Sequence, residues 1–438
     1  MLTGCAAIAQ TDTLRVMAYN VLYYGDTPPC QAPHSVLHGY LETIVAYANP
    51  DVISLEKMAA IPIYTGDNSG SAPAGFADSI VQFALDAAFP GRYAYCTYTN
   101  TSGADNISIL FYDKNKLGFA GIVSSYANIT DFNTYKLYYL SANLATTHDT
   151  VFLYVTCNHD NSGSGSSDAA TRGAQIVGEM AQIETHFTTL PNMLNMGDFN
   201  TQNSSEVCYQ ALVAPTDTGF RFYEPSFYPD AVYTYPANWA TDPGAYAPNL
   251  TTSTRETSVP NGCGSTGGGK LWFDHIFVSS SIINNEAGIS YIPHSYRAIG
   301  NDGNRVGISI NAAPTNTAAP TTVIDALFQM SNKYPVMADF AVRALTPPTG
   351  IVTQSIEKER ITIVNPVNDQ ITLHVSAGIV GKKISITCMD MPGRMQLNET
   401  VTVTGETMQI PCILAPGVYC IRANVENSVD TRVIVTKE

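Results

Sequence analysis

Runs in which apolar and polar residues alternate occur along the whole chain, and they predict half-buried β-strands. Up to residue 345 these runs are separated by segments with helical spacing, of which 169–186 is the clearest. Strands that alternate with helices predict a layered α/β architecture. After residue 350 no helical spacing appears, and three alternating runs predict a small all-β sandwich: 360–364, 370–375 and 383–387.

Breaks in this pattern divide the chain into four predicted parts. Residues 1–10 end in small residues that fit a signal-peptide remnant cleaved after Ala9, although Cys5 leaves lipid attachment open as an alternative. The other three parts are the α/β unit, a linker that contains two prolines and a glycine, and an immunoglobulin-like β-sandwich. They are predicted at 11–345, 346–356 and 357–438.

Composition limits the classes of function. Of the 438 residues, 45% are hydrophobic and only 13% are charged, which is typical of ordered globular domains. The net charge is −15 and the 22 basic residues form no run, so tight non-specific binding to nucleic acid is not expected. No apolar stretch is long enough to predict a transmembrane span.

The nine cysteines include no Cys-x-x-Cys pair, which argues against a structural zinc site. Eight would remain if Cys5 left with a signal peptide. Export would permit disulfides, and a buried free thiol is an equally good interpretation of each cysteine.

Six short motifs in the α/β unit place polar residues beside apolar runs. They are Leu14–Val21, Pro50–Lys57, Asn106–Phe111, Asn158-His159, Gly197–Asn200 and Phe273–Val278. In order and spacing they resemble the endonuclease/exonuclease/phosphatase superfamily, which is also described as DNase I-like. The resemblance implies a four-layer α/β sandwich, with two β-sheets flanked by helices, and an active site that uses Mg²⁺ or Mn²⁺ to hydrolyse phosphate esters.

Five site residues of that superfamily are present. The resemblance assigns Asn20 to the neighbourhood of the metal, and Asp198 and Asn200 to positioning of the nucleophile and the phosphate. It assigns His159 to a phosphate contact and Asp274 to the orientation of a catalytic histidine. The framework of a phosphate-ester site is therefore expected at these positions.

Three other positions of the pattern are substituted. Lys57 stands where the family has its metal-binding glutamate, and Asn332 and Lys333 stand where it has a metal-side aspartate and the catalytic histidine. Each change adds positive charge, which should repel a divalent cation. We therefore expect no bound metal cofactor, and we expect the Lys57 and Lys333 ammonium groups to neutralise Asp198 and Asp274 instead.

Two neighbouring residues offer alternative roles. Glu56 could replace the lost glutamate after a one-residue slip, and His275 could form a displaced dyad with Asp274. Successive side chains of a strand point to opposite faces, so Glu56 is expected to face away from the site, and His275 away from Asp274. A β-bulge would change the direction of Glu56.

Four segments of the β-rich tail are informative: Asn365–Asp369, Met389–Arg394, Leu414–Cys420 and Arg432–Glu438. Together they resemble the C-terminal sorting domain of the type IX secretion system. The resemblance implies export through the periplasm, contact with the type IX secretion machinery, and a secreted or cell-surface location. An immunoglobulin-like appendage used for binding is the alternative.

The leading interpretation is an exported member of the superfamily that binds a phosphorylated or other anionic ligand and is inactive or impaired as a phosphodiesterase. A first alternative is an active metal-dependent extracellular nuclease or phosphatase in which a desolvated Lys333 transfers the proton. A second alternative is a surface adhesion or glycan-binding module, which the 25 tyrosines and the acidic surface would suit.

Overall fold

The chain divides into two compact units, Met1–Pro347 and Pro348–Glu438. The computed structural model describes residues 11–25, 34–60, 76–141, 144–147, 150–227, 238–260, 263–343, 361–364, 367, 369–390, 394–425 and 429–437. The predicted signal-peptide remnant at 1–10 and the predicted linker at 346–356 lie outside these residues.

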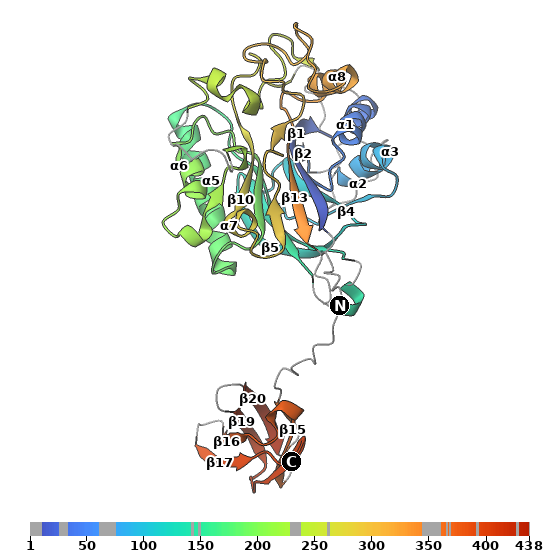
Figure 1. The fold of residues 1–438 in the computed structure, drawn as a ribbon. Helices are drawn as coiled ribbons and strands as arrows, with labels where there is room; N and C mark the ends of the chain where they lie inside the picture. The colour runs from blue at the N-terminus through green and yellow to red at the C-terminus, as the bar shows by residue number, and fades with distance from the viewer. Residues whose placement is uncertain are drawn as a thin grey trace, which may run out of the picture. The chain divides into compact units, whose positions relative to one another are not determined.

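The first sheet of the first unit has seven strands in the order β11-β13-β1-β2-β4-β3, with the short β12 also paired to β13 (Figure 1). The pair β1–β2 is parallel, and the other pairs in this sheet are antiparallel. The strands are β1 (Thr11–Tyr24), β2 (Val52–Ala59), β3 (Tyr93–Tyr95), β4 (Asn106–Asp113), β11 (Ile289–Tyr291), β12 (Arg297–Ala298) and β13 (Val336–Arg343).

The second sheet has six strands in the order β5-β6-β7-β8-β10-β9. It is also mixed, because β7 and β8 run parallel while its other pairs are antiparallel. The strands are β5 (Leu117–Asn128), β6 (Thr130–Tyr139), β7 (Phe152–His159), β8 (Met193–Asp198), β9 (Phe222–Tyr223) and β10 (Asp274–Ser279).

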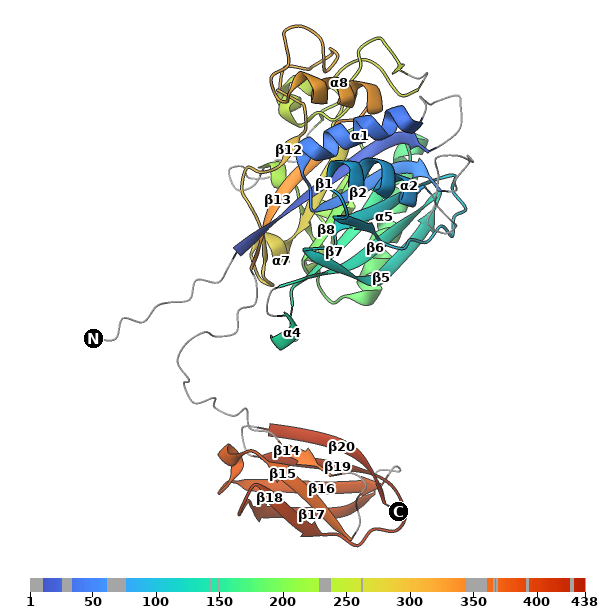
Figure 2. The same ribbon diagram turned by 90° about the vertical axis from the view of Figure 1, so that its right-hand side faces the viewer.

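Helices cover the outer faces of the two sheets. Figure 1 shows α5 and α6 on one side of the paired sheets and α1, α2 and α3 on the other, and Figure 2 shows α8 next to α1. The predicted helix at 169–186 is confirmed as the greater part of α5. The helices are α1 (His34–Ala48), α2 (Ala77–Ile80), a π-helical turn (Val81–Leu85), α3 (Asp86–Ala88), α4 (Leu144–Thr147), α5 (Ser166–His186), α6 (Val207–Val213), α7 (Ser280–Ile283) and α8 (Thr321–Met330).

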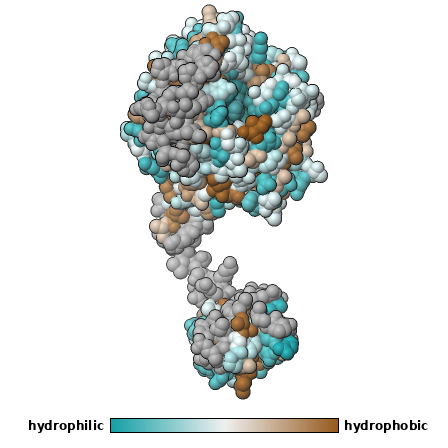
Figure 3. All heavy atoms as spheres, turned by 180° about the vertical axis from the view of Figure 1, so that it is seen from behind, coloured by the Kyte–Doolittle hydropathy of each residue, from teal (hydrophilic) through white to brown (hydrophobic). Residues whose placement is uncertain are grey.

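Apolar residues of both sheets fill the space between them. Val16 and Val52 from the first sheet belong to the same buried cluster as Val155, Met196 and Ile276 from the second. A separate cluster lies between the second sheet and α5 and α6. The predicted four-layer arrangement, helices–sheet–sheet–helices, is thereby confirmed. Figure 3 shows that on the face of this unit drawn there, coloured apolar residues occur in small separate groups among polar ones.

The second unit is all β, as predicted. One antiparallel sheet contains β14 (Ile361–Ile363), β15 (Gln370–Val375) and β18 (Thr407–Pro411), in that order. The other contains β17 (Met395–Thr402), β16 (Lys383–Asp390), β19 (Gly417–Val425) and β20 (Val429–Lys437), also in spatial order. Inward-facing side chains such as Leu373 and Ile386 form a core of their own. Within the described residues of the chain, no helix is long and apolar enough to cross a membrane.

Candidate functional site

Neighbouring strands bring the predicted residues to one end of the space between the two sheets. His159 on β7, Asp198 on β8 and Asp274 on β10 are direct partners in the strand register, so their side chains share one face. On the first sheet, Asn20 of β1 is the register partner of Glu56 of β2. Asn20 Nδ2 donates a hydrogen bond to Asp198 Oδ2 at 2.8 Å, so these two faces meet.

A cleft of about 420 Å³ opens at this end of the sheets. Its walls include seven of the eight predicted positions: Asn20, Lys57, His159, Asp198, Asn200, Asn332 and Lys333. The eighth, Asp274, is fully buried beside Lys333. A wider groove of about 600 Å³ lies along α5 and α6, but its walls are mainly aliphatic and include none of these residues.

Lys333 fills the centre of the site. Ser331 Oγ donates to the backbone oxygen of Asn20 at 2.7 Å and so fastens the segment between α8 and β13 to the first sheet. Lys333 Nζ then lies 2.9 Å from Asp198 Oδ2 and 3.9 Å from Asp274 Oδ2. Lys333 is only 5% exposed, so its ammonium group occupies the space between two buried carboxyl groups.

The two carboxyl groups differ in protonation. Burial alone would raise the pKa of Asp198, but the Lys333 ammonium and the hydrogen bond from Asn20 hold this pKa below its usual value. Burial raises the pKa of Asp274 well above its usual range, and the neighbouring charge of Asp198 adds to this rise, although Lys333 opposes it. The centre therefore contains one close ion pair, Lys333 with Asp198, beside Asp274, whose burial favours the protonated form.

Lys57 lies at the wall of the cleft rather than at its centre. The register between β2 and β4 shifts between Leu55 and Met58, and Lys57 has a positive φ of 62°. Its Nζ lies 3.9 Å from the centroid of the Tyr23 ring, a cation–π contact. The expectation that Lys57 neutralises Asp198 or Asp274 directly is not met, because among the described residues only Lys333 forms an ion pair with either carboxyl group.

Glu56 departs from the expected direction. It was expected to face away from the site, but its register partner Asn20 points into the site and Glu56 shares that face. The register shift and the left-handed backbone at Lys57 end the simple alternation of the strand, which explains the difference. Glu56 is fully buried and accepts a hydrogen bond from Ser54 Oγ. Burial raises its pKa well above the usual range, and the charge of Asp198 adds to this rise, so the protonated form of Glu56 is favoured.

His159 and Asn200 complete the predicted set. Burial, together with the nearby charge of Lys57, lowers the pKa of His159 to about 4, so the imidazole is neutral at neutral pH. Asn200, with a positive φ of 48°, donates from its backbone nitrogen to Asp198 Oδ1 at 3.1 Å. Its Nδ2 donates to the backbone oxygen of Asp160 at 2.9 Å. Asn200 therefore serves as a brace for Asp198 and for the end of β7.

Asn332 lies in the cleft wall next to Ser265. Its Nδ2 donates to Ser265 Oγ at 2.7 Å, and its backbone oxygen accepts from the backbone nitrogen of Thr254 at 3.2 Å. Asn332 thus connects the Gly-rich segment around Ser265 to the site, a connection that the sequence did not indicate.

His275 lies on the opposite face of β10 from Asp274, as strand alternation predicted. Its Nδ1 lies 2.8 Å from Glu224 Oε2. Aromatic rings surround it, the nearest being Trp272 at 4.6 Å between ring centroids. His275 is therefore a core residue under α6, and the displaced Asp–His dyad is not formed.

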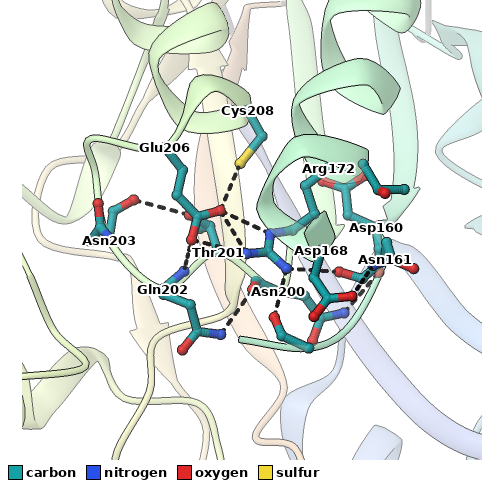
Figure 4. A network of polar contacts seen from close by, with 12 residues as sticks. Asp160, Asn161, Asp168, Arg172, Asn200, Thr201, Gln202, Asn203, Glu206 and Cys208 are labelled. Atoms are coloured by element: carbon teal, nitrogen blue, oxygen red, sulfur yellow. Dashed lines mark hydrogen bonds and ion pairs between the residues drawn. The ribbon is translucent and has the colours of Figure 1, made fainter. Parts of the chain in front are cut away.

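A buried arginine that the sequence did not single out holds two loops at the mouth of the cleft (Figure 4). Arg172 on α5 is fully buried, and its Nε and Nη2 donate to the two carboxylate oxygens of Glu206 at 2.9 and 3.0 Å. Its Nη1 donates to the backbone oxygens of Asn161 and Gly163 at 3.1 and 2.8 Å. Glu206 in turn accepts from the backbone nitrogen of Gln202 at 2.9 Å. Gly163 and Gln202 both line the cleft, so Arg172 holds two of the segments that form its walls.

A second residue missed from the sequence is Asp160, which directly follows His159. It is 1% exposed, and burial raises its pKa well above the usual range, with Glu179 and Asp198 adding to the rise. Its backbone oxygen is the acceptor for Asn200. Its position directly after the Asn158-His159 motif was the one feature of the sequence that could have pointed to it.

The residues present do not fit a divalent cation. Lys333 Nζ already pairs with Asp198 and stands beside Asp274, and Lys57 adds a second ammonium group to the wall of the cleft. Within the described part of the chain, no group of three or more His, Cys, Asp or Glu side chains is arranged to hold a metal ion.

Comparison with known families identifies the tail. Residues 365–437 match the family model described as the secretion system C-terminal sorting domain. The tail is a sorting domain. The chain is therefore a secreted or cell-surface protein that uses the type IX secretion machinery, as the sequence predicted.

Solved structures resemble the chain as a whole or the first unit. An endonuclease/exonuclease/phosphatase from Beutenbergia cavernae has 11% identity and a TM-score of 0.39, covering 97% of this chain and 99% of that one. Truncated TDP2 from Caenorhabditis elegans has 12% identity and a TM-score of 0.40, with 75% and 97% covered. A protein of the same family from Leptotrichia buccalis has 12% identity and a TM-score of 0.42, with 74% and 98% covered. None of the curated proteins compared matches the sequence.

Proposed function

We propose that the first unit is an exported endonuclease/exonuclease/phosphatase-type domain whose cleft binds a phosphate ester or other small anion without a divalent cation. On this proposal the domain is inactive or strongly impaired as a phosphodiesterase. The observation that carries the proposal is the position of Lys333 Nζ, 2.9 Å from Asp198 and 3.9 Å from Asp274. A protein ammonium group there provides the positive charge that a cation would otherwise bring.

The charges around the cleft favour an anionic ligand. Burial raises the pKa values of Asp274 and Glu56 well above their usual range, which disfavours negative charge there, and Lys333 balances Asp198. Lys57 at the wall forms no ion pair with a carboxylate among the described residues, and its ammonium group lies over the face of the Tyr23 ring. The cleft therefore carries a net positive charge near its opening, which attracts anions.

Hydrogen-bond donors near that charge suit a phosphate group. The walls contain amide side chains and hydroxyl groups, and Gly163 and Gly264 leave backbone atoms accessible there. Phosphate oxygens accept hydrogen bonds from such groups, and a lysine adds a point charge. Experiment can distinguish this proposal from the two alternatives. An active nuclease or phosphatase would hydrolyse its substrate, and a glycan-binding module would bind glycans that carry no negative charge.

Anion binding is tested by isothermal titration calorimetry with inorganic phosphate and phenyl phosphate in excess EDTA. We expect binding to survive EDTA, and we expect Lys57→Met to weaken it at least several-fold. Lys136→Met is the matched control, because Lys136 also rests on an aromatic ring, 4.0 Å from the centroid of Phe152, but lies outside the cleft. Equal loss in both variants, or binding that requires Mg²⁺, would contradict the proposal.

Catalysis is tested separately with bis(p-nitrophenyl) phosphate and with DNA, in the presence of Mg²⁺, Mn²⁺ or Ca²⁺. We expect no turnover above background. Metal-dependent turnover that disappears in Lys333→Met would instead establish an active hydrolase with Lys333 in its mechanism. Glycan binding that is unaffected by phosphate and by Lys57→Met would favour the adhesion module.

A further inference from the structure

The sorting domain contains three cysteines, and two of them face each other across its core. Cys388 lies on β16, where it follows the inward-facing Ile384 and Ile386 at intervals of two residues. Cys412 directly follows β18 and lies two residues after the buried Ile410. Because β16 and β18 belong to different sheets, the two thiols enter the same core from opposite sides.

The two thiols lie in the same buried core. In this structure they are free, and the nearby Cys412 thiol contributes to the raised pKa of the Cys388 thiol. Cys388 is fully buried and Cys412 is 5% exposed. Burial also raises the pKa of the Cys388 thiol to about 11, so the thiol of the folded domain is protonated and a poor nucleophile. Any reaction of this pair with an oxidant therefore belongs to folding, before the core closes.

Strand geometry keeps the third cysteine, Cys420, away from the core that contains Cys388 and Cys412. In the pairing of β16 with β19, Cys388 is opposite Ile421, and Cys420 is opposite Met389. Alternation along the strands places Cys420 on the outer face of this sheet, while Cys388 faces the core. Cys420 is also only partly buried.

The chain is also exported, and it already contains one disulfide. Cys263 in the first unit is disulfide-bonded, with a partner outside the described residues. The sorting domain directs the chain through an oxidising compartment, which permits disulfides between neighbouring thiols.

We propose that Cys388 and Cys412 form a disulfide that joins the two sheets of the sorting domain during export. The reaction is thiol–disulfide exchange with an oxidised protein dithiol or with glutathione disulfide. One cysteine attacks as the thiolate, a mixed disulfide forms, and the second cysteine displaces the reduced partner. Two protons and two electrons leave the pair, and the oxidant is reduced to its thiols.

The pairing is tested on the full chain, exported to a bacterial periplasm. The protein is denatured in acid, its free thiols are blocked with N-ethylmaleimide, and it is digested with trypsin without reductant. Cleavage after Lys383, Arg394 and Arg422 places Cys388 alone in one peptide, whereas Cys412 and Cys420 share another. Mass spectrometry of wild type and of Cys420→Ser therefore resolves which sulfur is linked. Only samples in which Cys263 is found in a disulfide are evaluated, because that bond shows that the chain met an oxidising environment.

We expect the two tail peptides to be linked in wild type and in Cys420→Ser, and to be separate in Cys412→Ser. In wild type, Cys420 should carry the blocking group. Blocked thiols at both Cys388 and Cys412 in a chain whose Cys263 is linked would overturn the proposal. A link between Cys420 and Cys388, in wild type or in Cys412→Ser, would overturn it as well.

Discussion

Replacing Lys333 with methionine tests the internal ion pair most directly. Methionine keeps much of the side-chain volume but removes the ammonium group 2.9 Å from Asp198 Oδ2. Breaking a buried ion pair by removing one partner costs about 3–5 kcal/mol, because the remaining charge stays buried. Asp198 keeps its hydrogen bonds from Asn20 Nδ2 and the backbone nitrogen of Asn200. We therefore expect the free energy of unfolding to fall by about 3 kcal/mol at pH 7.5.

The same substitution should change how stability depends on pH. In wild type the pKa of Asp198 is held below its usual value, so its contribution is present at neutral pH and is lost only as pH falls below that value. In Lys333→Met the carboxyl group is buried without its counter-charge, so its pKa should rise and the folded state should take up a proton. The stability difference between wild type and variant should therefore be largest near pH 7.5 and shrink toward pH 4.

Urea unfolding followed by tryptophan fluorescence measures this difference. The chain has two tryptophans, Trp239 and Trp272, and both are buried in the first unit, so the signal reports on that unit alone. Lys57→Met is the control, since it removes the same charge from the cleft wall and should cost about 0.5–1 kcal/mol for its cation–π contact. A loss below about 1 kcal/mol for Lys333→Met, or a difference that stays constant with pH, would refute the assigned role.

Three further predictions concern the same cleft. Combining Lys57→Glu, Asn332→Asp and Lys333→His should create Mg²⁺ or Mn²⁺ binding in calorimetry and hydrolysis of bis(p-nitrophenyl) phosphate; a folded triple variant that remains inert would contradict the proposal that these three residues prevent catalysis. Arg172→Met should destabilise the first unit by about 3 kcal/mol, because it removes the guanidinium partner of the Glu206 carboxylate and the donor to two backbone oxygens. Hydrogen exchange should then accelerate at 161–165 and 202–206, and unchanged exchange in both loops would contradict the role as a clamp. His159 is neutral in the folded state, with its pKa lowered to about 4, so wild type should lose stability as pH falls from about 6.5 to about 4. His159→Gln should flatten that part of the curve of unfolding free energy against pH, and an unchanged slope would assign it to other groups.

Much of the architecture could be predicted because it depends on periodicity, which is local. The helix α5 and the strands of the tail follow directly from the spacing of apolar residues. Strand register also explains why His159, Asp198 and Asp274 meet. Each lies at the end of its strand, and Asp198 on β8 is the register partner of both His159 on β7 and Asp274 on β10. Such residues can be grouped from sequence once the strand order is known.

Other features depend on contacts between distant segments and had no local signal. Strand alternation predicted that Glu56 would face away from the site, but a bulge and one left-handed residue, Lys57, place it on the face of Asn20. Arg172 is a single arginine in an amphipathic helix, and its role appears only when the loops at 161–163 and 202–206 fold against it. Backbone irregularities and buried side-chain hydrogen bonds of this kind cannot be inferred from spacing.

The position of Lys333 also explains why the remaining acidic residues can persist in a site that does not fit a metal. Asp198, Asp274 and Glu56 lie close enough to raise one another's cost of ionisation, and three charged carboxylates buried together would be strongly unfavourable. One ammonium group in contact with Asp198 stabilises a single negative charge, and burial raises the pKa values of the other two acids, which favours their protonated forms. A histidine at position 333 would remove the ammonium group that Asp198 needs, and it would not supply the carboxylate ligands that a divalent cation needs. Lys333→His alone should therefore be less stable than wild type at pH 7.5 and gain no metal binding, whereas the triple variant should regain stability when Mg²⁺ is added.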